Sequence, residues 1–175
     1  MRLFHFSDDP AIAVFEPRPV RTPVKRPAGQ EWLNGPLVWA IDDAHSFLYF
    51  FPRECPRIVI WPTERTTLAD RARWIGATSA HSVAFIEARW MERLEATTLY
   101  RYDLPLSPFA SIDDVGMWVS RQTVIPLGVE AMRGLPAYLV EARVELRPVE
   151  HLLPLKAVWG STLHASGIRL RNALA

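Results

Sequence analysis

Short apolar runs separated by polar, proline-bearing breaks dominate the hydrophobic pattern of this chain. Runs rich in Val, Ile, Phe and Trp have the length and composition of β-strands. The pattern predicts strands over residues 2–6, 37–41, 57–61, 98–104 and 143–149, and one or two more over 116–132, broken near Pro126. The run at 57–61 is apolar enough to lie in the middle of a sheet.

Other segments repeat their apolar residues at helical spacing. In residues 82–95 these residues are three and four positions apart, which predicts an amphipathic helix. They are Val83, Ile86, Trp90 and Leu94. Further short helices are predicted over 10–15, 44–51, 67–77, 134–142 and 150–159, the last interrupted by a proline. The pattern of residues 161–175 fits more than one structure.

Residues 16–36 form the longest stretch without such a pattern, and they contain five prolines and two glycines. This composition predicts an extended loop without a helix, because proline removes a backbone donor and restricts the residue before it. A loop of this length in a small domain is often a lid or a ligand-binding arm.

Helices and strands are interspersed along the chain, without an internal repeat and without a linker that would separate two domains. The βαβ regularity and the glycine-rich phosphate loops of doubly wound folds are missing. We therefore expect an α+β fold in a single compact domain over residues 1–175, with mixed or antiparallel split sheets and flanking helices.

Composition narrows the functional classes. A length of 175 residues with 49% hydrophobic residues and a mean hydropathy of +0.01 describes a folded globular protein. No apolar run approaches the roughly 20 residues of a membrane helix, and the first 20 residues lack a signal-peptide pattern, so a cytoplasmic location without membrane contact is expected. Cys55 is the only cysteine, which leaves no disulfide framework or thiolate cluster.

Charge adds one more constraint. The net charge of +1 argues against bulk nucleic-acid binding. Of the 20 cationic residues only Lys25 and Lys156 are lysines. Arginine suits bidentate phosphate contacts, although high-GC genomes produce the same bias.

Two groups of residues are candidates for ion binding from spacing alone. His5 with Asp8 and Asp9, and Asp42 with His45, have the ligand types of a carboxylate–imidazole metal site, but Asp pairs after strands are also ordinary caps. No metal is expected, because no His-x-His or HExxH spacing supports one. Ser166–Asn172, with Arg169 and Arg171, reads either as an anion site or as an edge strand with its arginines outside.

Several blocks are shared with known proteins. The phrases "HFSDDP", "EWLNGPLVWAID" and "SGIRLRNA" resemble a family of short bacterial proteins without an established activity. In addition, "LFHF", "PLVWAIDDAHSFLYFF" and "PRIVIWPTE" are similar to the first half of ADP-ribosyltransferase-like domains, over about residues 3 to 63.

The second resemblance implies an NAD site. His5 matches the histidine in the first strand of that family, which binds the NAD ribose, and Trp39 matches the aromatic residue that stacks on nicotinamide. The third motif, usually a glutamate, has no clear counterpart. Gln122 is its best candidate as a catalytic residue, with Ser120 beside it as a cofactor contact.

These observations lead to two hypotheses of different class and to a plain alternative. The first is an NAD-using transferase or glycohydrolase that cleaves the nicotinamide–ribose bond, with NAD as its substrate. The second is a non-catalytic module that binds a nucleotide or a phosphorylated RNA end. Its phosphate contacts are expected among Arg18, Arg53, Arg169 and Arg171. The alternative is a structural or interaction role without a small ligand.

Overall fold

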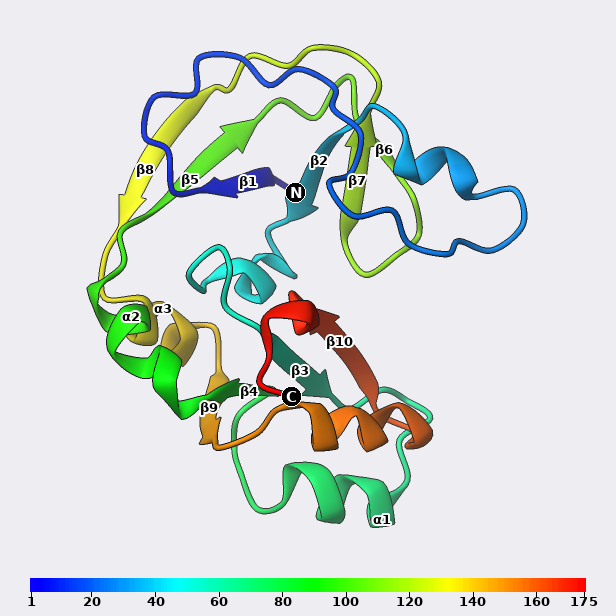
Figure 1. The fold of residues 1–175 in the computed structure, drawn as a ribbon, viewed down its shortest axis with the longest axis vertical. Helices are drawn as coiled ribbons and strands as arrows, with labels where there is room; N and C mark the ends of the chain where they lie inside the picture. The colour runs from blue at the N-terminus through cyan, green and yellow to red at the C-terminus, as the bar shows by residue number, and fades with distance from the viewer. The chain divides into compact units, whose positions relative to one another are not determined.

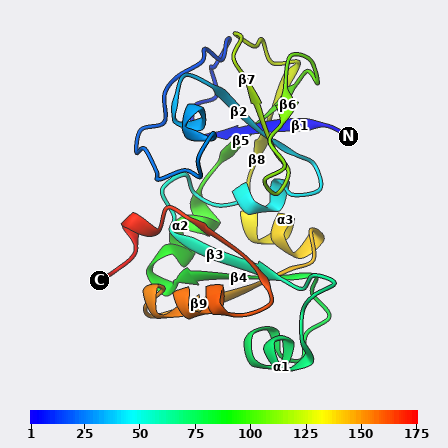
Figure 2. The same cartoon turned by 90° about the vertical axis from the view of Figure 1, so that its right-hand side faces the viewer.

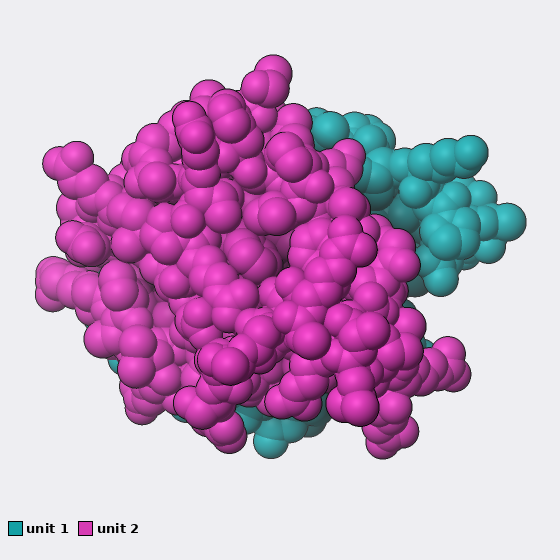
Figure 3. Space-filling view, turned by 90° about the horizontal axis from the view of Figure 1, so that it is seen from below, with its two compact units in different colours: residues 1–46, 99–132 teal, residues 47–98, 133–175 magenta.

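The computed structural model describes residues 1–175 and contains two β-sheets. Contacts group the residues into two compact units, coloured separately in Figure 3. Unit 1 comprises residues 1–46 and 99–132, and unit 2 comprises residues 47–98 and 133–175. Each unit is built from two separate stretches of chain, so the chain crosses between them three times.

Unit 1 contains a six-stranded sheet in which every neighbouring pair is antiparallel. Its strand order is β6-β7-β2-β1-β5-β8, and the strands can be followed in Figure 1. The strands are β1 (Leu3–Ser7), β2 (Val38–Asp42), β5 (Leu99–Leu104), β6 (Ala110–Ser111), β7 (Met117–Ser120) and β8 (Gly128–Met132).

Side chains alternate between the two faces of this sheet, and each face has its own apolar cluster. One cluster gathers Leu3, Ala40 and Tyr102, and it is covered by Phe15 from the segment after β1. The other gathers Leu33, Leu37 and Val119, with Trp39 and Ile112 at its margin. The residue before the proline-rich loop, Phe15, therefore packs on one face of the sheet, and Leu33 near the end of the loop packs on the other.

Unit 2 contains a four-stranded sheet in the order β10-β3-β4-β9. The strands are β3 (Arg57–Trp61), β4 (Ser82–Glu87), β9 (Val144–Val149) and β10 (His164–Ile168). All pairs are antiparallel except β4 with β9, which is parallel. Every residue of β3 and β4 is buried, so both faces of the sheet are covered, and the prediction that residues 57–61 form a central strand is confirmed.

Short helices supply the cover on the sheet of unit 2. They are α1 (Leu68–Asp70), which continues as the π-helix η3 (Arg71–Ile75), α2 (Met91–Ala96), α3 (Leu135–Glu141) and the 3-10 helix η5 (Leu153–Gly160). Figure 2 shows α3 and η5 on opposite faces of this sheet. The remaining 3-10 helices are η1 (Glu31–Asn34), η2 (Ser46–Tyr49), η4 (Ala88–Trp90) and η6 (Leu170–Asn172). The fold is thus α+β with mostly antiparallel sheets, as predicted.

The largest error of the sequence prediction concerns residues 82–95. Their first half is strand β4, and only η4 and α2 after it are helical. β4 is buried on both faces, so apolar residues occupy consecutive positions and show no period of two. Some of these apolar positions also fall at helical spacing, which led to the wrong prediction. Tertiary burial has overridden the local pattern.

Two smaller predictions are also wrong, and one is confirmed only in part. Residues 10–15 form no helix, because the Asp9 carboxylate accepts the amide of Ala11 and Phe15 instead pairs with Val124. Of residues 44–51 only η2 is helical. The proline-rich loop does contain one helical turn, η1.

Among the helices of the structure, none combines the length and the apolar character needed to span a bilayer.

Candidate functional site

His5 lies on β1, where its imidazole binds the backbone of the neighbouring strand. Its Nδ1 is 2.9 Å from the carbonyl oxygen of Trp39, and its ring centroid is 4.7 Å from that of Phe15. Because a carbonyl only accepts, Nδ1 carries the proton and donates it. The pairing of β1 with β2 ends with Phe4 opposite Ile41, so His5 binds strand β2 directly after the last pair of residues.

The side chains of His5 and Trp39 lie on opposite faces of the sheet. The register pairs Leu3 with Asp42, which places His5 on the face of Ala40, whereas Trp39 shares the other face with Val119. The two apolar clusters agree with this division. Their roles toward a ligand stay predictions, but the sheet does not bring the two rings together, because neighbours in a strand alternate.

On its own face, Trp39 meets an arginine from the proline-rich loop. The guanidinium carbon of Arg26 lies 5.9 Å from the centroid of the tryptophan ring. Both Nε1 of Trp39 and Nε of Arg26 are buried and have no hydrogen-bond partner. Two buried donors in one stack are unusual, because an unsatisfied buried donor costs about 1–3 kcal/mol. They are therefore candidate donors to an acceptor outside the chain.

The only other buried polar side-chain atom without a partner is Nε1 of Trp90, in unit 2. Its neighbours are the guanidinium groups of Arg89 and Arg93, at 5.7 and 5.2 Å from the ring. That indole stands alone, without a second orphaned donor. The pair at Trp39 is therefore distinct within the chain.

Further arginines in unit 1 lack a carboxylate partner. Arg18, Arg26 and Arg121 make no ion pair within 4.0 Å, although the chain forms several elsewhere. Arg121 stacks over Trp32 at 4.8 Å, and the backbone of Arg18 bridges to Leu37. Residues 16–36 carry four cations and two acids, a net charge of +2. This part of the chain attracts anions.

Ser120 and Gln122 form a local turn at the end of β7. The hydroxyl of Ser120 accepts the amide of Gln122 at 3.0 Å and donates to its carbonyl oxygen at 3.1 Å. Ser120 is buried, and Gln122 is exposed. Since both contacts are with the backbone, the position of the serine is explained by the turn, and the catalytic role of Gln122 stays a prediction.

Asp42 and His45 meet at the other end of β2. Oδ1 of Asp42 accepts both the backbone amide of His45, at 2.9 Å, and its Nδ1–H, at 2.8 Å. Gly116, with φ of +71°, packs so closely that an added Cβ would lie 2.5 Å from this imidazole nitrogen. The imidazole is thus held in the tautomer whose Nε2 carries the lone pair, and the side chain is 33% exposed.

This pair is not part of a larger set of metal ligands. The structure holds no group of three or more His, Cys, Asp or Glu side chains placed to bind a metal ion. An oriented carboxylate–imidazole pair with a half-buried imidazole is instead an arrangement that a general base can have. The i, i+3 spacing of Asp42 and His45 was the sequence signal for it, whereas the role of Gly116 has no signal in the sequence.

The C-terminal arginines, predicted as phosphate contacts, bind a carboxylate of their own unit. Glu54 lies 3.9 Å from Arg169 and 3.5 Å from Arg171, and it also accepts Nδ2 of Asn172 at 2.9 Å. The hydrogen bond from Asn172, followed by these arginines, lowers the pKa of Glu54. β10 is an edge strand, so the edge-strand alternative is confirmed as far as Ile168, but Arg169 has φ of +57° and the strand does not continue to Arg171.

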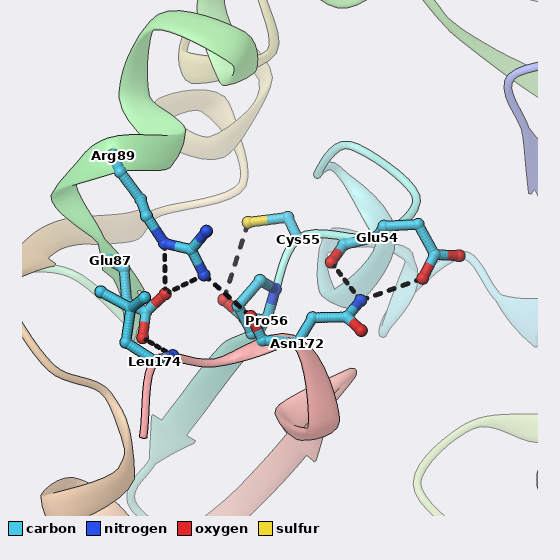
Figure 4. A network of polar contacts seen from close by, with 7 residues as sticks. All are labelled: Glu54, Cys55, Pro56, Glu87, Arg89, Asn172 and Leu174. Carbon is cyan, nitrogen blue, oxygen red and sulfur yellow. Dashed lines mark hydrogen bonds and ion pairs between the residues drawn. The ribbon is translucent and has the colours of Figure 1, made fainter.

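Figure 4 shows hydrogen bonds that attach Asn172 and Leu174, near the C-terminus, to Glu54, Glu87 and Arg89. Glu87, fully buried, accepts Nε of Arg89 at 2.9 Å and the amide of Leu174 at 2.7 Å. Arg89 also donates to the carbonyl oxygen of Asn172 at 2.8 Å. The "SGIRLRNA" block is therefore accounted for by attachment of the C-terminal segment to β4 and to residue Glu54.

Sequence reasoning missed Arg57, which is 2% exposed. It donates to the carbonyl oxygens of Leu48 and Cys55, and its guanidinium carbon lies 5.6 and 5.0 Å from the rings of Tyr49 and Phe51. Burial lowers the pKa of Arg57 to about 10. An arginine at the start of an otherwise apolar strand was the available signal.

Neither a curated protein nor a solved structure matches the chain. A family model matches residues 4–173, nearly the whole length of the chain. The resemblance predicted from the sequence blocks is thereby confirmed at the level of an uncharacterised family, and the chain belongs to the family of unknown function DUF6886.

Proposed function

We propose that the protein binds the phosphate group of a nucleotide, and that the paired donors of Trp39 and Arg26 are its anion subsite. The observation that carries the proposal is that Nε1 of Trp39 and Nε of Arg26 are both buried and both without an acceptor. A phosphate offers several acceptor oxygens and a negative charge, so one group satisfies donors several ångströms apart.

The surroundings support this class of ligand. Arg18 and Arg121 add cationic groups without carboxylate partners, and the proline-rich loop that carries Arg26 covers the strand of Trp39. Arginine and tryptophan together also suit a nucleotide, because bases stack on aromatic faces. The phosphate belongs either to a free nucleotide such as NAD or ADP-ribose, or to the 5′ end of RNA.

Titration of the protein with four probes tests the proposal. Inorganic phosphate, NAD, ADP-ribose and a short 5′-phosphorylated RNA are compared with the same RNA bearing a 5′-hydroxyl, by calorimetry and by thermal shift. We expect binding that weakens with salt and depends on the phosphate. Absence of binding for all probes at millimolar concentration contradicts the proposal and leaves an ordered water as the acceptor.

Two variants locate the subsite. Trp39→Phe keeps an aromatic ring and removes the N–H, and Arg26→Gln removes the charge. Each is expected to weaken binding about tenfold or more, the value of a hydrogen bond to a charged group. The control is Arg73→Gln, which removes a stack of the same kind over Trp74 in unit 2. If the control weakens binding as much as the two variants, the site is wrongly placed.

A second candidate function, cleavage of the nicotinamide–ribose bond of NAD, is favoured by the Asp42–His45 pair. In this reaction water attacks C1′ of the ribose, the bond from C1′ to the nicotinamide nitrogen breaks, and Nε2 of His45 takes the proton of the water. Asp42 holds the imidazole in the required tautomer. The products are nicotinamide, ADP-ribose and the proton taken up by His45.

Release of nicotinamide, followed by chromatography, tests the second candidate. His45→Gln is expected to lower the rate at least a hundredfold, and His81→Gln in unit 2 is the control. Gln122 lies beyond the opposite end of β2 from His45, so Gln122→Glu is expected to leave this rate unchanged. A rate that is the same in His45→Gln and in the native protein contradicts the base assigned to this reaction.

A further inference from the structure

Trp32 is the most exposed tryptophan of unit 1. It lies in η1, the helical turn of the proline-rich loop, and 41% of its surface is exposed. The other tryptophans of this unit, Trp39 and Trp118, are partly buried against its two apolar clusters. An exposed indole on a loop offers a π-face on which a flat ligand group can stack.

Arg121 lies over the ring of Trp32. Its guanidinium carbon is 4.8 Å from the ring centroid, and the side chain is exposed and makes no ion pair. A guanidinium group stacked on an aromatic ring keeps its N–H donors at the edge of the stack, where an acceptor can reach them. The pair therefore combines a flat apolar surface with a positive charge.

This stack lies on the face of the sheet that carries Trp39. Val119 pairs with Trp39 in the register of β2 with β7, and Arg121 follows Val119 by two residues. Leu33, the neighbour of Trp32, packs against Val119 in the apolar cluster that has Trp39 at its margin. Diagonal neighbours across a strand pair are about 7–8 Å apart, within reach of long side chains. The stack is thus close enough to Trp39 for one ligand to contact both.

Hydrogen bonds connect the loop segment of Arg26 to η1. Oδ1 of Asn34 accepts the amide of Val24 at 3.3 Å, and its Nδ2 donates to the carbonyl oxygen of Val24 at 2.9 Å. The amide of Gln30 donates to the carbonyl oxygen of Pro27 at 3.0 Å, which closes the turn before η1. The two stacks are therefore held in one arrangement, which lowers the ordering cost of binding.

We propose that the Trp32–Arg121 stack is the base subsite for the nucleotide whose phosphate binds Trp39 and Arg26. This inference rests on the proposed phosphate binding. The base stacks on the indole of Trp32, and Arg121 supplies the positive charge beside it. The ligand class is then a nucleotide with its base, either free or at the 5′ end of RNA, and not inorganic phosphate or a phosphorylated sugar.

Calorimetry with AMP and ribose 5-phosphate tests the proposal, because the two ligands share the phosphate and the sugar and differ in the base. AMP is expected to bind about tenfold more tightly or better, the value of stacking one base. Equal binding of both ligands overturns the base subsite and leaves the phosphate subsite standing. Binding of neither ligand at millimolar concentration overturns both. A 5′-phosphorylated RNA that begins with adenine, compared with AMP, distinguishes an RNA end from a free nucleotide.

Trp32→Leu locates the subsite, since it keeps an apolar side chain and removes the π-face. We expect it to lower the affinity for AMP to that for ribose 5-phosphate and to leave the latter unchanged. The matched control is Trp159→Leu, at a tryptophan of unit 2 that is 46% exposed, and it is expected to bind AMP like the native protein. Circular dichroism verifies each fold, and Trp32→Gln decides if Trp32→Leu does not fold. A folded Trp32 variant that keeps the native preference for AMP overturns the proposal.

Discussion

The two units of this chain differ in how their most deeply buried polar groups are satisfied. In unit 2 the two buried charged side chains are satisfied within the unit: Glu87 binds Arg89 and the amide of Leu174, and Arg57 donates to two backbone carbonyl oxygens. In unit 1, Arg18, Arg26 and Arg121 have no carboxylate partner, and two buried donors have no acceptor. Polar groups with partners inside the protein stabilise the fold, whereas buried donors without a partner are candidates for contact with a ligand. Unit 1 is therefore the first place to test for ligand binding.

The largest expected effect is on the reactivity of the Cys55 thiol, which tests whether reagents in solution reach the core of unit 2. Burial raises the pKa of Cys55 to about 12, so the thiolate fraction at neutral pH is about a thousandfold lower than for an ordinary cysteine. A thiol reagent such as DTNB is expected to react slowly with the native protein and quickly after unfolding in guanidinium chloride. Fast reaction of the native protein would contradict the burial of Cys55 in unit 2.

Removal of Arg57 tests whether buried polar groups maintain the fold of unit 2. Arg57→Met leaves the carbonyl oxygens of Leu48 and Cys55 without their donor, and is expected to cost about 3 kcal/mol of unfolding free energy. Urea denaturation gives the value. Arg133→Met, at an exposed arginine, is the matched control and is expected to change stability by less than about 0.5 kcal/mol. Equal stabilities for the two variants would contradict the assigned role.

Gly116 makes it possible to test the Asp42–His45 pair of unit 1 through stability alone. Gly116→Ala combines a strained φ of +71° with a collision against the imidazole, and is expected to cost about 2 kcal/mol. Gly134→Ala has a similar φ of +68° and no atom within 4 Å, so it carries the strain alone, about 1 kcal/mol. If the two variants are equally stable, the imidazole does not lie against Gly116.

The smallest effect concerns acid stability. The hydrogen bond from Asn172 and the nearby arginines lower the pKa of Glu54 below its ordinary value of 4.5. The ionised carboxylate therefore stabilises the fold above pH 4.5, and this contribution is lost as the pH falls through the lower, folded-state value. Because Glu54 is partly exposed, the contribution is about 0.5 kcal/mol or less.

Asn172→Ala removes the largest cause of that shift. Its stability is expected to fall less than that of the native protein when both are acidified from pH 6 to about pH 3, after the difference at pH 6 is subtracted. Denaturation at each pH gives the comparison. A parallel loss in the two proteins would show that the network around Glu54 does not depend on its charge.

Much of the fold followed from local sequence because its strands are short, apolar and bounded by breakers. Residues 57–61 match β3, and the break near Pro126 separates β7 from β8. Residues 82–87 were misassigned, because a strand buried on both faces shows no period of its own. The candidate site was harder to predict from the sequence, since the faces on which His5 and Trp39 lie depend on the register of β1 with β2.

The sequence by itself determined the α+β class, most strand positions, the family and the residue types available for chemistry. Only the tertiary structure decided which of these residues meet. It placed Arg26 over Trp39, and Gly116 against His45, contacts between residues 13 and 71 positions apart in the chain. Local patterns report the burial of each segment, whereas a site requires contacts across strands, and these depend on strand order and register.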